Sequence, residues 1–150
     1  MDKIKIKQGI LTACLRKQEG VIQTARTAME EALESANEED QTRDLYDPYR
    51  TQMLSKRDMF AQQLEKAVEE KQLLEKLQPC EECDTVHFGS AVITDQQKLF
   101  VSIGLGKFEY NGETWYAISP RVPLYEVIKG KKKGDTFIFN GRKFTIRDVF

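Results

Sequence analysis

The chain has 150 residues, which allows one or two small domains, and its net charge at pH 7 is −1 although 31% of its residues are charged. No stretch approaches the ~20 apolar residues of a membrane span, and the N-terminal segment lacks the apolar core of a signal peptide. Three cysteines without a secretion signal indicate a reducing setting, so we expect a cytoplasmic protein that contacts no membrane.

Two stripes of apolar residues at alternating spacings of three and four predict two amphipathic helices. The residues between them are mostly Lys, Arg, Glu and Gln, which favour exposed helix, and polar Gln18 fills a gap in the first stripe. Two such helices joined by a short polar link predict an antiparallel coiled-coil hairpin over residues 1–79. The stripes are Leu11, Leu15, Ile22, Ala25, Met29 and Ala32, then Met53, Phe60, Leu64, Ala67, Leu74 and Leu77.

The hairpin is predicted to turn between Ala36 and Asp47. Asp47 is suited to cap the second helix, and Pro48 to be its first residue, where the missing N–H is no loss. From Glu34 to Asp47 there are six acidic residues and one basic residue, a local charge of −5. An acidic tip over about residues 36–50 indicates contact with a partner, the alternative being a solvated turn.

Residues 80–85 form a predicted linker, and residues 86–150 a small antiparallel β-sheet domain with one short helix near 123–129. The chain is therefore expected to be an α+β protein. Asn111-Gly112 and Asn140-Gly141 predict tight hairpin turns. The expected strands are Val86–Ile93, Lys98–Ile103, Thr114–Ile118, Asp135–Phe139 and Lys143–Phe150, and the expected core is Phe100, Phe108, Trp115, Phe137, Phe139 and Phe144.

Basic residues gather in the last part of the chain. From Lys129 to Arg147 there are seven basic residues and one acidic residue, a local charge of +6. The interpretations are an acidic partner surface, nucleic acid, or a solvated turn; no motif that interleaves aromatic and basic residues supports nucleic acid.

The cysteines and the single histidine leave three interpretations open. Cys80 and Cys83 form a CxxC pair that His87 follows, and a hairpin that turns near residue 44 places Cys14 near residue 74. All four side chains would then gather at the base of the hairpin. A Cys₃His zinc site, a redox switch and inert linker cysteines remain as alternatives, since one CxxC pair is a weak signal.

Two segments of the second half carry a resemblance to a known family. Residues 86–92, VHFGSAV, resemble V-x-F-G-A/S-x-V, and residues 123–135, PLYEVIKGKKKGD, resemble P-L/I-A/G-x-x-L/I-L/I-G-K-x-x-G-D. With the helical hairpin before them, the whole chain resembles the bacterial Gre-type transcript-cleavage and elongation factors. The resemblance implies that the second domain is FKBP-like.

The predicted tip resembles the family in part. Gre-type factors carry D-L-S/K-E-N-A-E-Y at this place. Asp44, Leu45 and Asp47 match here, with Asp in place of Glu, whereas Pro-Tyr-Arg-Thr replaces Asn-Ala-Glu-Tyr.

The resemblance implies an accessory factor of RNA polymerase, not an enzyme in its own right. The hairpin would enter the secondary channel, where Asp44 and Asp47 would help to hold a second Mg²⁺ jointly with the polymerase and stimulate cleavage of backtracked RNA. We expect a monomer with no tightly bound cofactor of its own. The residues expected to contact the polymerase are Leu45, Tyr46, Tyr49, Pro123, Leu124 and Lys131.

Other functions remain open at this point. One is a Gre-like regulator that occludes the channel without cleavage, and another is a coiled-coil adaptor that binds a different protein. A free-standing enzyme is the weakest hypothesis, because the chain has one histidine, no nucleophile elbow and no glycine-rich phosphate loop.

Overall fold

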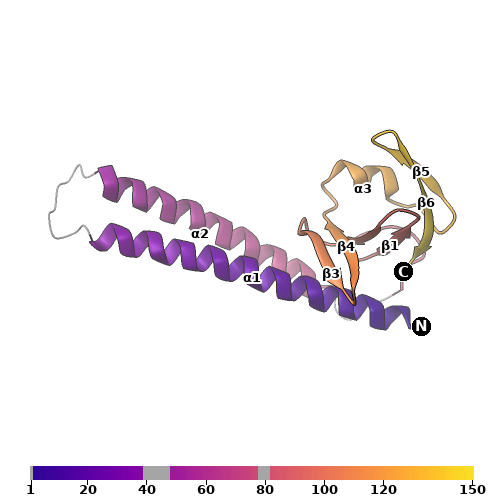
Figure 1. Ribbon diagram of the computed structural model, residues 1–150, viewed down its shortest axis with the longest axis horizontal. Coiled ribbons are helices and arrows are strands. Elements are labelled where there is room, and N and C mark those ends of the chain that lie inside the picture. The colour runs from indigo at the N-terminus through magenta and orange to yellow at the C-terminus, as the bar shows by residue number, and fades with distance from the viewer. Residues whose placement is uncertain (1, 39–47, 78–81) are drawn as a thin grey trace. The chain divides into compact units, whose positions relative to one another are not determined.

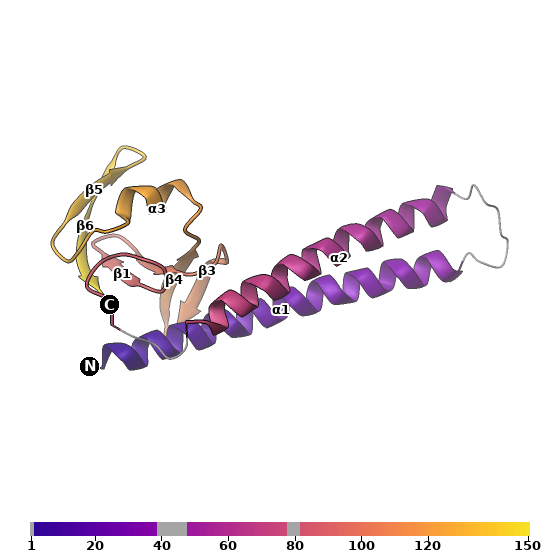
Figure 2. The ribbon, with the colours of Figure 1, turned by 180° about the vertical axis from the view of Figure 1, so that it is seen from behind.

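The computed structural model describes residues 2–38, 48–77 and 82–150. Two long helices come first, followed by a six-stranded sheet with one short helix, so the predicted α+β fold class is confirmed (Figures 1 and 2). The elements are α1 (Lys3–Glu38), α2 (Pro48–Glu75), β1 (Ala91–Thr94), β2 (Lys98–Val101), β3 (Gly106–Tyr110), β4 (Glu113–Ile118), α3 (Pro123–Ile128), β5 (Thr136–Phe139) and β6 (Arg142–Val149).

The chain divides into two compact units. Met1–Lys17 and Gln72–Phe150 form the first, which we call the sheet unit, and Gln18–Lys71 form the second, which we call the distal hairpin. The sheet unit is therefore built from two segments that are separate in the sequence. The predicted division of the chain at residues 80–85 stays a prediction.

The distal hairpin has the predicted seam. Its buried side chains come mainly from the two apolar stripes, and Gln18, only 2% exposed, donates a hydrogen bond from Nε2 to the Ala67 carbonyl at 2.7 Å. A buried amide needs such a partner, which explains how a polar residue fits this seam. Lys71 and Glu19 add an ion pair between the helices. The buried seam residues are Gln18, Ile22, Ala25, Ala32, Ala36 and Ala67.

The ends of the helices agree with the sequence only in part. Pro48 is the first residue of α2, as predicted. Helix α1 begins at Lys3, well before the first stripe at Leu11, because Ile6 and Ile10 continue its apolar face toward the N-terminus. Cys14 and Leu74 lie in one apolar cluster, which confirms the predicted facing of these two positions.

The strand order across the sheet is β3-β4-β2-β1-β6-β5. Strands β2 and β4 run parallel and every other neighbouring pair runs antiparallel, so the sheet is mostly antiparallel, as predicted. Strand β3 was not predicted. It pairs with β4 through the expected Asn111-Gly112 turn, where φ is 54° at Asn111 and 79° at Gly112.

The prediction of a strand from Val86 is wrong at its start, because β1 begins at Ala91. Val86 instead exchanges backbone hydrogen bonds with the turn after α3: its N–H donates to the Lys131 carbonyl and its carbonyl accepts from Gly130, both at 2.8 Å. A tight turn follows, with Gly89 at φ 95°, a conformation that favours glycine.

The sheet unit buries side chains on both faces of its sheet, since neighbouring residues of a strand point to opposite sides. Phe100 and Trp115 join the cluster that contains Ile10 of α1, whereas Leu99 joins the cluster that contains Ile128 of α3. The sheet is thus a layer between the first turns of α1 and α3 (Figure 1). The predicted aromatic core is confirmed apart from Phe139, which is half-buried.

Candidate functional site

The predicted tip falls largely on residues that the structure does not describe. Asp44, Leu45, Tyr46 and Asp47 all lie outside the described ranges, so the Mg²⁺ ligands and the tip contacts stay predictions. Tyr49 is described. It lies in the first turn of α2 with 44% of its surface exposed, which leaves its ring accessible to a partner.

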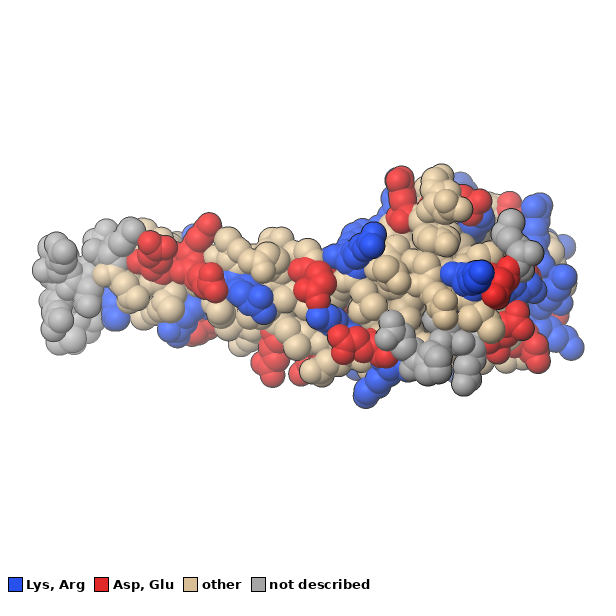
Figure 3. Space-filling model, turned by 90° about the horizontal axis from the view of Figure 1, so that it is seen from below, with Lys and Arg blue, Asp and Glu red and all other residues tan. Residues whose placement is uncertain are grey.

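The last turns of α1 carry an acidic, partly apolar surface. Glu30, Leu33, Glu34 and Asn37 line a hollow of about 400 Å³, and Leu33 is 38% exposed. Glu30 and Glu34 are four residues apart, so they are neighbours on one helix face and repel each other. The negative charge predicted for the tip therefore begins on described helix, as the red side chains along the hairpin in Figure 3 illustrate.

The segment from Pro123 to Asp135 folds as a short helix and a tight turn. Pro123 is the first residue of α3, where its fixed φ suits the helix and its missing N–H is no loss. Gly130 and Gly134 have φ of 77° and 93°, which explains glycine at both positions. The Asp135 carboxylate accepts a hydrogen bond from the Lys132 N–H at 3.0 Å and closes the turn.

The predicted contact residues of this segment have different surroundings. Pro123 is exposed, while Leu124 packs against the apolar cluster beneath α3. Lys131 is half-buried, and its backbone bonds Val86 and Ile128. The Leu124 side chain and the Lys131 backbone thus hold the segment together, and the contact of these residues with a polymerase stays a prediction.

The basic residues predicted as a group surround this turn and the β5–β6 hairpin. Lys129 pairs with Glu126 at 3.0 Å, but both side chains are more than half exposed, so the pair contributes little stability. Figure 3 shows Lys and Arg side chains gathered at the end of the sheet unit. The exposed members are Lys129, Lys132, Lys133, Arg142, Lys143 and Arg147.

The cysteines and histidine are brought together only in part. Cys83 Sγ lies 3.3 Å from His87 Nε2, whereas Cys14 lies in the other apolar cluster of the sheet unit. Burial raises the pKa of the Cys14 thiol from 9.0 to about 12, and nearby Lys17 opposes the shift. Cys80 lies outside the described residues, and within the described ones no three His, Cys, Asp or Glu side chains form a group that could hold a metal ion. The zinc hypothesis remains untested.

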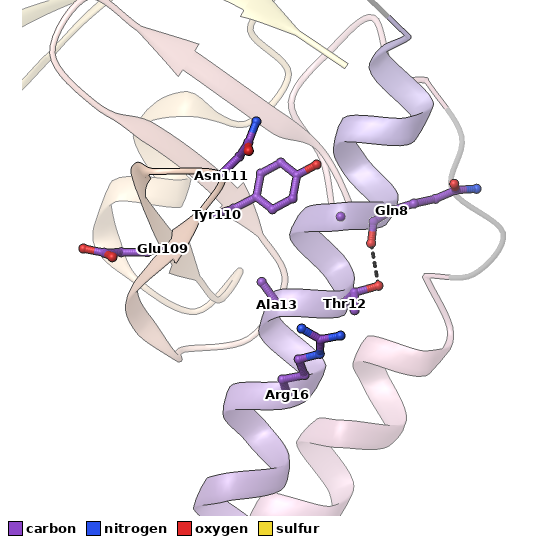
Figure 4. Close-up of a pocket in the computed structure, with 8 residues that line it drawn as sticks. Gln8, Thr12, Ala13, Arg16, Glu109, Tyr110 and Asn111 are labelled. Carbon is purple, nitrogen blue, oxygen red and sulfur yellow. Dashed lines mark hydrogen bonds between the residues drawn. The ribbon is translucent and has the colours of Figure 1, made fainter.

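A contact that the sequence did not predict joins α1 to the β3–β4 turn. Tyr110 is directed toward α1 beside Gly9, so close that a Cβ at residue 9 would lie 2.3 Å from the tyrosine Oη (Figure 4). A hollow of about 420 Å³ adjoins this contact, with Arg16 on its rim. A glycine inside a predicted helix was the one sequence signal for such a close approach.

The described residues contain no helix that is both long and apolar enough to span a lipid bilayer.

No protein-family model matches the sequence. No curated protein matches it either. Among solved structures, the chain is similar to the crystal structure of GreA factor homolog 1 (Gfh1) protein of Thermus thermophilus, with 15% sequence identity, a TM-score of 0.35, and coverage of 93% of this chain and 92% of that chain. A second structure, of the transcription factor Gfh1, gives 15% identity and a TM-score of 0.34, with coverage of 93% and 90%.

Proposed function

We propose that this chain is a Gre-like accessory factor that binds RNA polymerase through its secondary channel and stimulates the cleavage of backtracked RNA. The proposal is supported by residues 123–135, whose sequence resembles a Gre motif and which fold as the short helix and tight turn expected of it. The backbone conformation of this segment explains the proline, the two glycines and the closing aspartate of the motif. The same chain carries a long helical hairpin with an acidic end.

The hairpin supports the proposal through its length and charge. The 28 residues of α2 span about 40 Å at 1.5 Å per residue, enough for a side chain at the tip to act far from the opposite end of the helix. Glu30 and Glu34 lie on the described part of α1 beside the predicted tip. Their negative charge would attract cations and repel RNA phosphate groups along the side of the hairpin that leads to the tip.

The carboxylates of Asp44 and Asp47 would act in trans at the catalytic centre of the polymerase. Each offers hard oxygen atoms of the kind that Mg²⁺ prefers, and they are three positions apart in the sequence. When bound jointly with the polymerase, the metal would supply charge stabilisation and an oriented water for attack on the RNA backbone. Tyr49, exposed in the first turn of α2, would contact the channel wall.

The exposed basic residues around α3 and the β5–β6 hairpin support a second contact, with an acidic surface of the polymerase. Such a contact would speed association and weaken as ionic strength rises.

A second candidate function is occlusion of the channel without cleavage. The observation that favours it is the tip itself, where Pro48, Tyr49 and Arg50 replace the Asn-Ala-Glu of the family motif. An arginine in place of an acidic residue lowers the negative charge available to a metal.

The test mixes the protein and Mg²⁺ with stalled, backtracked elongation complexes of the cognate polymerase. Release of short 3′ RNA fragments is expected. The Asp44→Asn, Asp47→Asn double variant should still bind but lose cleavage, because it removes charge with little change of shape. The matched control is Glu65→Gln, Glu69→Gln, which removes the same charge from exposed positions of α2 away from the tip and should leave cleavage unchanged.

The other outcomes separate the hypotheses. Binding without release of fragments supports occlusion, and a full failure to bind polymerase supports the adaptor. Normal cleavage by the Asp44→Asn, Asp47→Asn variant would show that these aspartates are not the metal ligands.

A further inference from the structure

Three titratable side chains meet in the sheet unit, two of them from the segment between α2 and β1. Cys83 Sγ lies 3.3 Å from His87 Nε2, and the Lys7 ammonium donates a hydrogen bond to the same sulfur at 3.6 Å. Lys7 comes from α1 and is only 4% exposed, so a positive charge is held inside the protein beside a thiol. Buried lysines are rare because their charge is costly to desolvate, and this one places its ammonium beside the sulfur.

The hydrogen bonds of His87 define which ring nitrogen carries the proton. Nδ1 lies 3.0 Å from the Thr85 carbonyl, and a carbonyl can only accept, so Nδ1 carries the proton. In the neutral ring Nε2 is then the acceptor. It faces Cys83 Sγ and is placed to take the proton of the thiol.

The loop around the histidine holds this orientation. The buried Ser90 hydroxyl accepts from the His87 N–H at 2.9 Å and donates to the Thr85 carbonyl at 3.1 Å. The same carbonyl therefore fixes both the serine and the imidazole. A thiol, a base within hydrogen-bond reach and a third group that orients the base are the parts of an activated cysteine.

We propose that Cys83 is a reactive thiol that a small peroxide oxidises to the sulfenic acid. His87 Nε2 takes the thiol proton as the sulfur attacks one peroxide oxygen, so that an S–O bond forms while the O–O bond breaks. The leaving hydroxide takes the proton from His87 and departs as water. The sulfur is oxidised by two electrons, the peroxide is reduced, and the Lys7 ammonium stabilises negative charge on the sulfur during the attack.

This site is independent of the proposed action on RNA polymerase, since none of its residues belongs to the tip or to residues 123–135. The chain also contains its own negative control. Cys14 is fully buried among apolar side chains, and the pKa of its thiol is raised to about 12, so it has neither a base nor access to peroxide.

The experiment uses the full chain with Cys80→Ser, so that only Cys14 and Cys83 can react. The protein is treated with hydrogen peroxide and dimedone, which traps sulfenic acids, and the adduct on each cysteine is followed by peptide mass spectrometry. Cys83 should form the adduct and Cys14 should not. His87→Gln should slow adduct formation at least about tenfold, because it removes the base while the exposed position tolerates the change.

Lys7 is tested against a lysine of the same helix. Lys7→Met should slow the reaction several-fold, whereas Lys5→Met removes the same charge from an exposed position and should have no effect. Because Lys7→Met could unfold the buried site, the His87→Gln result decides the proposal. Absence of an adduct on Cys83, or the same rate in His87→Gln as in the parent, would overturn it.

Discussion

The sheet unit and the distal hairpin bury very different side chains. The sheet unit encloses large aromatic residues, with Trp115, Phe100 and Phe150 each at most 2% exposed. The fully buried seam residues of the distal hairpin are mainly alanines, with one isoleucine and the amide of Gln18, whereas Met53, Phe60 and Leu64 are half-buried. Burying an aromatic side chain stabilises a fold by several times as much as burying an alanine methyl.

The comparison teaches that the two regions are stabilised by different means. The sheet unit depends on its core, whereas the distal hairpin depends on helix propensity, a narrow seam and polar contacts between its helices. Helices with so little buried apolar surface open locally at a lower free energy than a packed core. We therefore expect the distal hairpin, which leads to the proposed tip, to be the less stable of the two regions.

The largest expected effect is in the sheet unit. Trp115→Ala should lower the free energy of unfolding by about 3–5 kcal/mol, measured by urea denaturation, because it leaves a cavity beside Phe100. Trp115→Phe should cost much less, since Nε1 has no hydrogen-bond partner among the described residues. A small effect of Trp115→Ala would mean that this core does not determine stability.

The same substitution, glycine to alanine, can be made in α1 once in each region to compare its effect on stability. Gly9→Ala should destabilise the sheet unit by about 1–3 kcal/mol, because the new methyl group collides with Tyr110. Gly20→Ala, in the distal hairpin, should stabilise by about 1 kcal/mol, since no described atom lies within 4 Å of its Cβ position. Thermal unfolding of both variants gives the comparison, and equal shifts of the same sign would contradict it.

Alkaline pH should act on the sheet unit through Cys14. Its pKa rises from 9.0 to about 12 on folding, so above pH 9 the unfolded chain loses a proton that the folded protein keeps. The contribution to stability is complete below pH 9 and is lost as pH rises toward 12, by about 1.4 kcal/mol at pH 10. Urea denaturation at pH 8 and pH 10 should show this loss in the parent protein and not in Cys14→Val.

The smallest effect is expected at the ion pair between Lys71 and Glu19 in the distal hairpin. Glu19→Gln should cost less than about 1 kcal/mol, because the carboxylate is 55% exposed and solvent screens the pair. The difference should shrink further in 1 M salt. A larger effect that persists at high salt would show that this pair is a main determinant of the hairpin.

The sequence predicted what depends on local pattern. The seam and the facing of Cys14 and Leu74 follow from helical spacing, and the position of Pro48 at the start of α2 follows from its missing N–H. The sequence-based prediction was wrong where contacts with distant segments determine the local structure. Val86 pairs with the turn after α3, and β3 forms as the partner of β4. Likewise, the short spacing between Cys83 and His87 predicted that these side chains lie close together. No pattern in the sequence predicted that Lys7, 76 positions before Cys83, would contact the same thiol.

The two-segment construction of the sheet unit has a consequence for how the protein is made. Lys3 bonds Asp148 across 145 positions of sequence, and its ammonium lies 5.9 Å from the centre of the Phe150 ring. While the ribosome is still producing the middle of the chain, the N-terminal turns of α1 have nothing to pack on. Their apolar face stays exposed to solvent until the packing partners between Ala91 and Phe150 have left the ribosome, and a chaperone can bind it during that period.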